Sequence, residues 1–222
     1  MISFPRQFVI TGTDTGVGKT VVAAILTRGL EASYWKPVQS GLEGKTDTEL
    51  VKAMTGLPEG HFLAEAYRLK TPISPHASAR RDGISIDQRR LALPPVTGPL
   101  IVEGAGGLLV PLNDQTLLLD VMRNWGLPVL LVARSRLGTI NHTLLSLMAL
   151  KTAGLEILGV VMNGAKEPES RQAIEEHGQV GVLAELAPLA ALTPETIGAA
   201  YWRLFGGGEG LIKRDGRWCR GR

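Results

Sequence analysis

Gly12-Thr13-Asp14-Thr15-Gly16-Val17-Gly18-Lys19-Thr20 is the stretch that decides the fold of this 222-residue chain. It follows the apolar run 8–11 and precedes the helix-forming run 21–30, so a glycine-rich turn joins a strand to a helix. Glycines let the backbone curl until successive N–H groups point at one spot, which the positive end of the helix also faces. The stretch therefore predicts a phosphate-binding loop. The simpler alternative is a glycine turn with a solvated lysine.

The end of this stretch carries the expected chemistry. The usual pattern, G-x-x-x-x-G-K-[ST], has a glycine where this chain has Thr13, but Gly-Lys-Thr at the helix entrance is kept. We expect Lys19 to reach the β- and γ-phosphates of a nucleotide and the Thr20 hydroxyl to bind Mg²⁺.

Apolar runs alternate with helix-period segments along the chain, which is the pattern of repeated βαβ units. We expect strands near residues 7–12, 32–38, 99–103, 128–133, 157–163 and 180–184. We expect helices near residues 19–30, 47–55, 116–125, 139–153, 168–177 and 194–204. Prolines interrupt the segment 56–99, for which we expect loops with one short strand and one short helix. The sequence predicts one α/β domain over residues 1–205, a P-loop NTPase-like, doubly wound, mainly parallel sheet with helices on both faces.

The basic balance of the chain, with a net charge of +3 and a pI near 9.2, arises at its end. Residues 213–222 hold five basic side chains against one acid, and a glycine-rich run precedes them. We therefore expect residues 206–222 to form a flexible, solvated tail rather than a nucleic-acid surface. A single cysteine excludes an internal disulfide, and no apolar run approaches the ~18 residues of a membrane span. These features predict a cytoplasmic protein that binds neither nucleic acid nor membrane.

Polar clusters follow several of the predicted strands, where ligands of parallel sheets collect. Lys36 and Ser40 end the second strand and could face the phosphate loop. Asp47 begins a predicted helix, so it is either a metal ligand or a helix cap. Glu103 follows a buried strand, where a second magnesium-binding carboxylate is expected, and the glycines after it permit close approach of a ligand.

The run Gly138-Thr139-Ile140-Asn141-His142 opens the predicted helix 139–153. Its free N–H groups make it a candidate anion site. A plain cap by Thr139 or Asn141 is the alternative.

Taken together, these motifs resemble those of the dethiobiotin synthetase family over about residues 6–195. The matching segments are Thr11-Gly12-Thr13-Asp14-Thr15, Gly18-Lys19-Thr20, Lys36-Pro37-Val38, Ser40-Gly41, Ser74-Pro75-His76, Glu103-Gly104-Ala105-Gly106-Gly107, Leu137-Gly138 and Ile140-Asn141-His142. The resemblance implies a homodimeric enzyme that closes a ureido ring on 7,8-diaminopelargonic acid with carbon dioxide and ATP.

The resemblance also implies roles for individual residues. Thr20, Asp47 and Glu103 would surround Mg²⁺, while Lys36 and Lys19 would neutralise a carbamate and the γ-phosphate. The nucleotide would be bound by Gly16, Val17, Gly18, Lys19, Thr20, Asp47, Glu103, Gly104, Ala105, Gly106 and Asn163, the last of these at the adenine. The diamine substrate would be bound by Ser40, Gly106 and Asn141, with Asn141 reaching across the dimer into the neighbouring site.

The chain departs from the family pattern in places. Gly16 stands where some relatives carry an acid that folds over the nucleotide, and Ala187 ends a segment in which the family often has proline. A partition-ATPase-type nucleotide switch of the same fold is the alternative function. Residues 13–16 lack the additional lysine that is typical of such switches.

Overall fold

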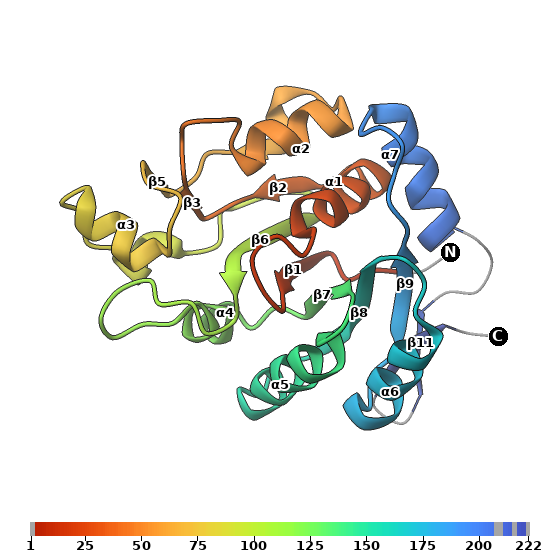
Figure 1. Ribbon diagram of the computed structural model, residues 1–222. Helices are drawn as coiled ribbons and strands as arrows, with labels where there is room; N and C mark the ends of the chain where they lie inside the picture. The colour runs from red at the N-terminus through yellow and green to blue at the C-terminus, as the bar shows by residue number, and fades with distance from the viewer. Residues whose placement is uncertain (1–2, 207–210, 215–216, 221–222) are drawn as a thin grey trace.

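The computed structural model describes residues 3–206 and, after them, the backbone of residues 211–214 and 217–220. Its centre is a sheet of seven strands in the order β4-β2-β6-β1-β7-β8-β9, with every neighbouring pair parallel (Figure 1). The strands are β1 (Gln7–Gly12), β2 (Ser33–Trp35), β4 (Phe62–Leu63), β6 (Leu100–Gly107), β7 (Val129–Ser135), β8 (Ile157–Gly164) and β9 (Val182–Leu186). The prediction of a doubly wound parallel sheet is confirmed.

Helices cover both faces of this sheet (Figure 1). One face carries α1 (Lys19–Leu30), α2 (Asp47–Thr55) and α7 (Pro194–Tyr201), and a π-helical turn, η3 (Trp202–Gly206), follows α7. The other face carries α4 (Leu118–Trp125), α5 (Thr139–Thr152) and α6 (Pro168–Gly178). The starts of α1, α2, α5, α6 and α7 agree with the prediction, and for α1 and α2 both ends agree.

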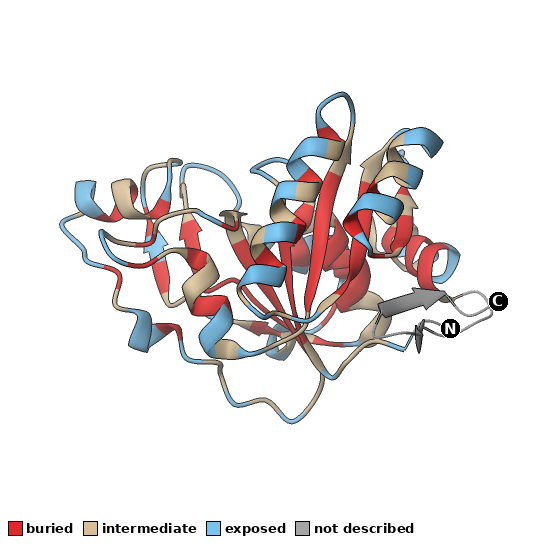
Figure 2. Cartoon of the chain, turned by 90° about the horizontal axis from the view of Figure 1, so that it is seen from below, coloured by how far each residue is buried: buried red, intermediate tan, exposed pale blue. Residues whose placement is uncertain are grey.

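The central strands are buried on both faces, as Figure 2 shows by their continuous red. In β1, Phe8 and Ile10 face the core under α1 and α7, while Val9 faces the core under α4. All three side chains have no exposed surface. Aliphatic side chains on both faces are what a covered parallel sheet requires, and this is why these runs showed no alternation.

The predicted strand 32–38 is in fact two short strands, β2 and β3 (Val38–Ser40). Pro37 lies between them and has no N–H to continue the ladder. β3 leaves the main sheet and pairs with β5 (Tyr67–Leu69) in a separate parallel pair. This break directs residues 36–40 out of the main sheet, beyond the carboxyl end of β2.

The segment 56–99 holds more structure than we expected. It contains two strands, β4 and β5, in place of one, together with the expected helix α3 (Pro75–Arg81) and the 3-10 turns η1 (Glu59–His61) and η2 (Gln88–Leu91). The prediction of one strand was wrong because β4 and β5 are only two and three residues long. Their pairing partners, β2 and β3, are distant in sequence.

The boundary at residue 205 and the flexibility of the tail stay predictions. Within the tail, the described residues form an antiparallel pair, β10 (Leu211–Arg214) and β11 (Arg217–Arg220), and the rest of it lies outside the described residues. In residues 3–206 and these two strands, we find no helix with the length and apolar character needed to cross a bilayer.

Candidate active site at the carboxyl ends of the strands

The phosphate loop lies between β1 and α1 and ends in Gly18, where the backbone conformation and a close neighbour both favour glycine. Gly18 is the N-cap of α1 and has φ of 97°, a left-handed conformation. A Cβ added there would lie 2.0 Å from the side-chain nitrogen of Asn163. No side chain caps α1, and its first turn holds no acid. The first N–H groups of the helix therefore remain available to an anion.

Lys19 is the first residue of α1 and is almost fully buried. Its ammonium group donates to the backbone oxygen of Asp14 at 2.9 Å. Burial lowers the pKa of Lys19 to about 8, with a further lowering by the nearby charge of Lys36 and an opposing effect of Glu103. A phosphate group would supply the anionic partner that this lysine lacks.

Thr20, Asp47 and Glu103 converge beside this lysine. The Thr20 hydroxyl donates to Asp47 Oδ1 at 3.2 Å and to Glu103 Oε1 at 3.0 Å. Asp47 lies in the first turn of α2, but the cap of that helix is Thr46, whose hydroxyl accepts from the N–H of Glu49. The Asp47 carboxylate is therefore directed at the site and does not cap its helix.

Lys36 follows β2 and forms an ion pair with both carboxylates. Its Nζ lies 2.7 Å from Asp47 Oδ2 and 2.9 Å from Glu103 Oε1, and it donates to the backbone oxygen of Gly104 at 3.2 Å. Trp35 pairs with Val102 in the parallel ladder, so the next step along both strands sets Lys36 against Glu103. Burial acts to lower the pKa of Lys36, but the two carboxylates outweigh it and hold the pKa above its ordinary value.

The Asp47 carboxyl shows the reverse effect. Burial acts to raise its pKa, but the Lys36 ammonium and the hydrogen bond from Thr20 hold it below its ordinary value. Both members of this ion pair are therefore charged at neutral pH.

Tyr34 is a member of the site that our sequence reasoning missed. Its hydroxyl donates to Glu103 Oε2 at 2.8 Å, and both side chains have no exposed surface. Burial and the adjacent Glu103 carboxylate raise the pKa of Tyr34 well above its ordinary value, so the hydroxyl stays protonated and donating. The available signal was alternation, because Tyr34 and Lys36 are two residues apart and share one face of the strand.

The donors at this site fit Mg²⁺. Thr20, Asp47 and Glu103 supply hard oxygen atoms, and Mg²⁺ is bound through one or two carboxylates together with substrate phosphates. Within the described part of the chain, no group of three or more His, Cys, Asp or Glu side chains could hold a metal alone. The two carboxylates and the hydroxyl suit a metal that arrives with a nucleotide.

A cavity of about 350 Å³ adjoins these charges. Its lining includes Thr15, Lys36, Gln39, Ser40, Asp47, Pro72, Ile73, Ala105, Gly106 and Val110. The Ser40 hydroxyl is buried there, and it has no hydrogen-bond partner among the described residues. An apolar wall with one unpaired hydroxyl and an ammonium suits a small ligand with both alkyl and polar parts.

Asn163 and Asn141 lie in different surroundings. Asn163, in β8, donates from Nδ2 to the backbone oxygen of Val17 at 2.9 Å and so contacts the phosphate loop. Asn141 lies exposed in the first turn of α5 and does not line the 350 Å³ cavity. The N-cap of α5 is Gly138, so neither Thr139 nor Asn141 caps this helix.

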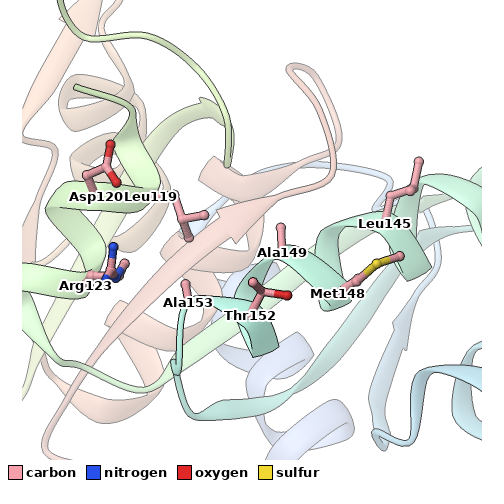
Figure 3. Close-up of a pocket in the computed structure, with 8 residues that line it drawn as sticks. All are labelled: Leu119, Asp120, Arg123, Leu145, Met148, Ala149, Thr152 and Ala153. Carbon is pink, nitrogen blue, oxygen red and sulfur yellow. The ribbon is translucent and has the colours of Figure 1, made fainter. Parts of the chain in front are cut away.

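A second hollow, of about 440 Å³, lies between α4 and α5, and Figure 3 shows the side chains that line it. Leu145 and Met148 line it from α5, and both are more than half exposed. Leu119 and Arg123 line it from α4.

The parallel sheet, the strand–loop–helix unit and the lysine at the helix start define a P-loop nucleotide-binding α/β protein. Solved structures of low sequence identity share this fold, and the similarity supports the fold only. A ParA family ATPase from Chlorobium tepidum superposes with a TM-score of 0.53 at 10% identity, covering 91% of this chain and 93% of its own. MinD from Pyrococcus horikoshii, solved with Mg-ADP, gives 0.51 at 15% identity, covering 91% and 90%.

Comparison with sequence relatives shows which family of P-loop proteins this chain belongs to. A family model described as an AAA domain matches residues 6–196. ATP-dependent dethiobiotin synthetase BioD from Agrobacterium fabrum is 53% identical over 90% of this chain and 94% of its own length. The protein of that name from Rhodopseudomonas palustris strain BisB5 is 52% identical over 89% and 93%. The chain belongs to the dethiobiotin synthetase family, and it is an enzyme of biotin synthesis.

Proposed function

We propose that this protein closes the ureido ring of dethiobiotin from 7,8-diaminopelargonic acid and carbon dioxide, with conversion of ATP to ADP and phosphate. The observation that carries the proposal is the convergence of Lys19, Lys36 and two carboxylates beside the cavity that contains Ser40. The names of the relatives reported above supply the product, dethiobiotin, and the dependence on ATP. The phosphate loop supplies a place for ATP.

The reaction we propose has three steps. One amine of the substrate adds to carbon dioxide to form a carbamate, ATP phosphorylates the carbamate oxygen, and the second amine attacks the carbon and expels phosphate. None of these steps requires a side-chain nucleophile. Phosphoryl transfer depends mainly on positioning and on neutralisation of charge.

The side chains divide this task by position. Lys19 and the N–H groups at the start of α1 neutralise and orient the phosphates, and Lys36 faces the cavity, where it holds the carbamate. Thr20, Asp47 and Glu103 would hold Mg²⁺, which would offset the negative charge of the phosphates. Ser40 and the backbone at Gly106 contact the diamine. Gly106 has φ of 67°, a left-handed conformation, and a Cβ there would lie 2.9 Å from the side chain of Val110, so this position in the cavity wall favours glycine.

We further propose that the active form is a homodimer that uses the α5 face. Leu145 and Met148 on α5 are 52% and 59% exposed, and Leu137 just before this helix is fully exposed. An apolar surface of this kind is stabilised when a second copy covers it. Asn141 lies on the same helix, so a partner packed there would bring it within reach of the substrate carboxylate in the neighbouring site.

One incubation tests the proposed activity. The protein is mixed with diaminopelargonic acid, bicarbonate, Mg²⁺ and ATP, and mass spectrometry follows the mass of the ureido product. The expected result is a product that needs both the diamine and ATP and that Lys19→Ala fails to form. ATP hydrolysis that is independent of the diamine, with no ureido product, would instead indicate a nucleotide switch.

A further inference from the structure

Gln39 is a nearly buried amide that joins two parts of the site. It lies in β3 between Lys36 and Ser40 and is 7% exposed. Its Nε2 donates to the backbone oxygens of Ser40 at 3.2 Å and Gly41 at 3.3 Å. Its Oε1 accepts from the backbone N–H of Asp47 at 3.2 Å. One side chain therefore bonds to both ends of the loop 41–46 that leads from β3 to α2.

The bond to Asp47 meets a specific need of α2. The first N–H groups of a helix have no partner within that helix. At the start of α2, the hydroxyl of Thr46 accepts from the N–H of Glu49, and the carboxylate of Glu49 accepts from the N–H of Thr46. This capping box leaves the N–H of Asp47 to an acceptor outside the helix, which is Gln39.

We propose that Gln39 is a positioning residue. Its amide fixes the start of α2, and with it the Asp47 carboxylate, relative to the strand that carries Ser40. The inference rests on the proposed function, because Asp47 and Ser40 are assigned there to Mg²⁺ and to the diamine. The Gln39 amide bonds to the backbone at the start of the loop 41–46 and to the backbone directly after it, so both ends of this loop are fixed to one side chain. The carboxylate of Asp47 then stays at Thr20 and Lys36, while the Ser40 hydroxyl stays in the cavity.

The chemistry of the contact explains why an amide is needed. Glutamate has the same shape and could accept from Asp47, but it could not donate to the two backbone oxygens. It would also add a negative charge close to the Asp47 carboxylate. Methionine keeps the length of the side chain and removes all three bonds. Gln39→Glu thus removes only the two bonds that Gln39 donates, whereas Gln39→Met removes all three bonds of the Gln39 side chain.

A matched control lies one residue beyond Asp47. The Thr48 hydroxyl donates to Glu65 Oε1 at 2.7 Å, so it also tethers α2, but to the segment before β5 and without a bond to Gln39. Thr48→Val removes this tether and keeps the size of the side chain. If α2 were simply less stable in these variants, the Gln39 and Thr48 substitutions would have the same effect on Asp47. The proposed positioning role predicts an effect of the Gln39 substitutions alone.

The test begins with the protein free of ligands. Amide hydrogen exchange measured by NMR should be about 10-fold faster at Asp47 in Gln39→Met than in the wild type, as expected for loss of one net hydrogen bond. Thr48→Val should leave the exchange at Asp47 unchanged. Calorimetry of ADP binding at several Mg²⁺ concentrations should show a several-fold higher Mg²⁺ requirement in Gln39→Met and Gln39→Glu only.

Two results would overturn the inference. One is unchanged exchange at Asp47 in Gln39→Met, and the other is an equal shift in the Mg²⁺ requirement of Thr48→Val. If Gln39→Met fails to fold, Gln39→Glu supplies the same comparison in Mg²⁺ requirement. A wild-type protein that formed no ureido product would defeat the proposed function and leave the exchange result at Asp47 as it stands.

Discussion

Tyr34→Phe is the most direct probe of how the fold supports the magnesium-binding carboxylate. The change keeps the ring in its buried place and removes only the hydroxyl that donates to Glu103 Oε2 at 2.8 Å. Glu103 is fully buried, so this oxygen would lose its donor without gaining access to water. A hydrogen bond to a charged group contributes about 1.5–3 kcal/mol, and we expect a loss of that size in the free energy of unfolding.

Urea unfolding at one protein concentration measures this loss, and the rate of product formation at increasing Mg²⁺ measures the effect on the site. We expect the half-saturating Mg²⁺ concentration to rise, because the Glu103 carboxylate loses one of the contacts that fix its orientation. Tyr67→Phe is the matched control. Tyr67 is also buried, and its hydroxyl bonds to the backbone of Asp87, accepting from the N–H at 2.9 Å and donating to the oxygen at 3.5 Å, rather than to a carboxylate of the site. Equal effects of the two variants on the Mg²⁺ requirement would refute the reasoning.

Four further predictions follow from the same geometry. Lys19→Ala should lower turnover by at least ~100-fold with the unfolding free energy little changed, as steady-state rates and urea unfolding would show. Because the Lys19 pKa is about 8, the charged form is lost above that pH. ADP binding should weaken there and take up protons, which calorimetry in two buffers of different ionisation enthalpy detects. Asp47→Asn and Glu103→Gln should each raise the Mg²⁺ concentration at half-maximal rate, and an unchanged requirement in both would contradict the shared site. Mixing Asn141→Ala with Lys19→Ala subunits should restore activity in heterodimers verified by native mass spectrometry, because both lesions then fall in one composite site.

The parts of the fold that the sequence predicted well share one property. β1 and β8, together with α1 and α5, are long enough for apolar runs or helical spacing to appear within a single window. β4 and β5 are two and three residues long, and their strand geometry depends on pairing with β2 and β3. No local pattern can indicate such strands, because their stability comes from contacts that are distant in sequence.

The same distinction applies to the site. Lys19 and Thr20 could be assigned because loop, lysine and helix are consecutive. Tyr34 and Glu103 are 69 positions apart, so their hydrogen bond follows only from the adjacency of β2 and β6. Gln39 gave no signal either, since its partner is the backbone of Asp47 and any residue has a backbone N–H.

The two buried lysines of the site have different partners, and their pKa values shift in opposite directions. A buried charge is tolerated when it is paired, and Lys36 has two carboxylate partners that keep its pKa high. Lys19 is bonded to a backbone oxygen, so burial dominates and its pKa falls. An arriving phosphate would therefore gain most from Lys19, whose pKa it would raise. Lys36 can contact a carbamate only by sharing its ammonium with Asp47 and Glu103.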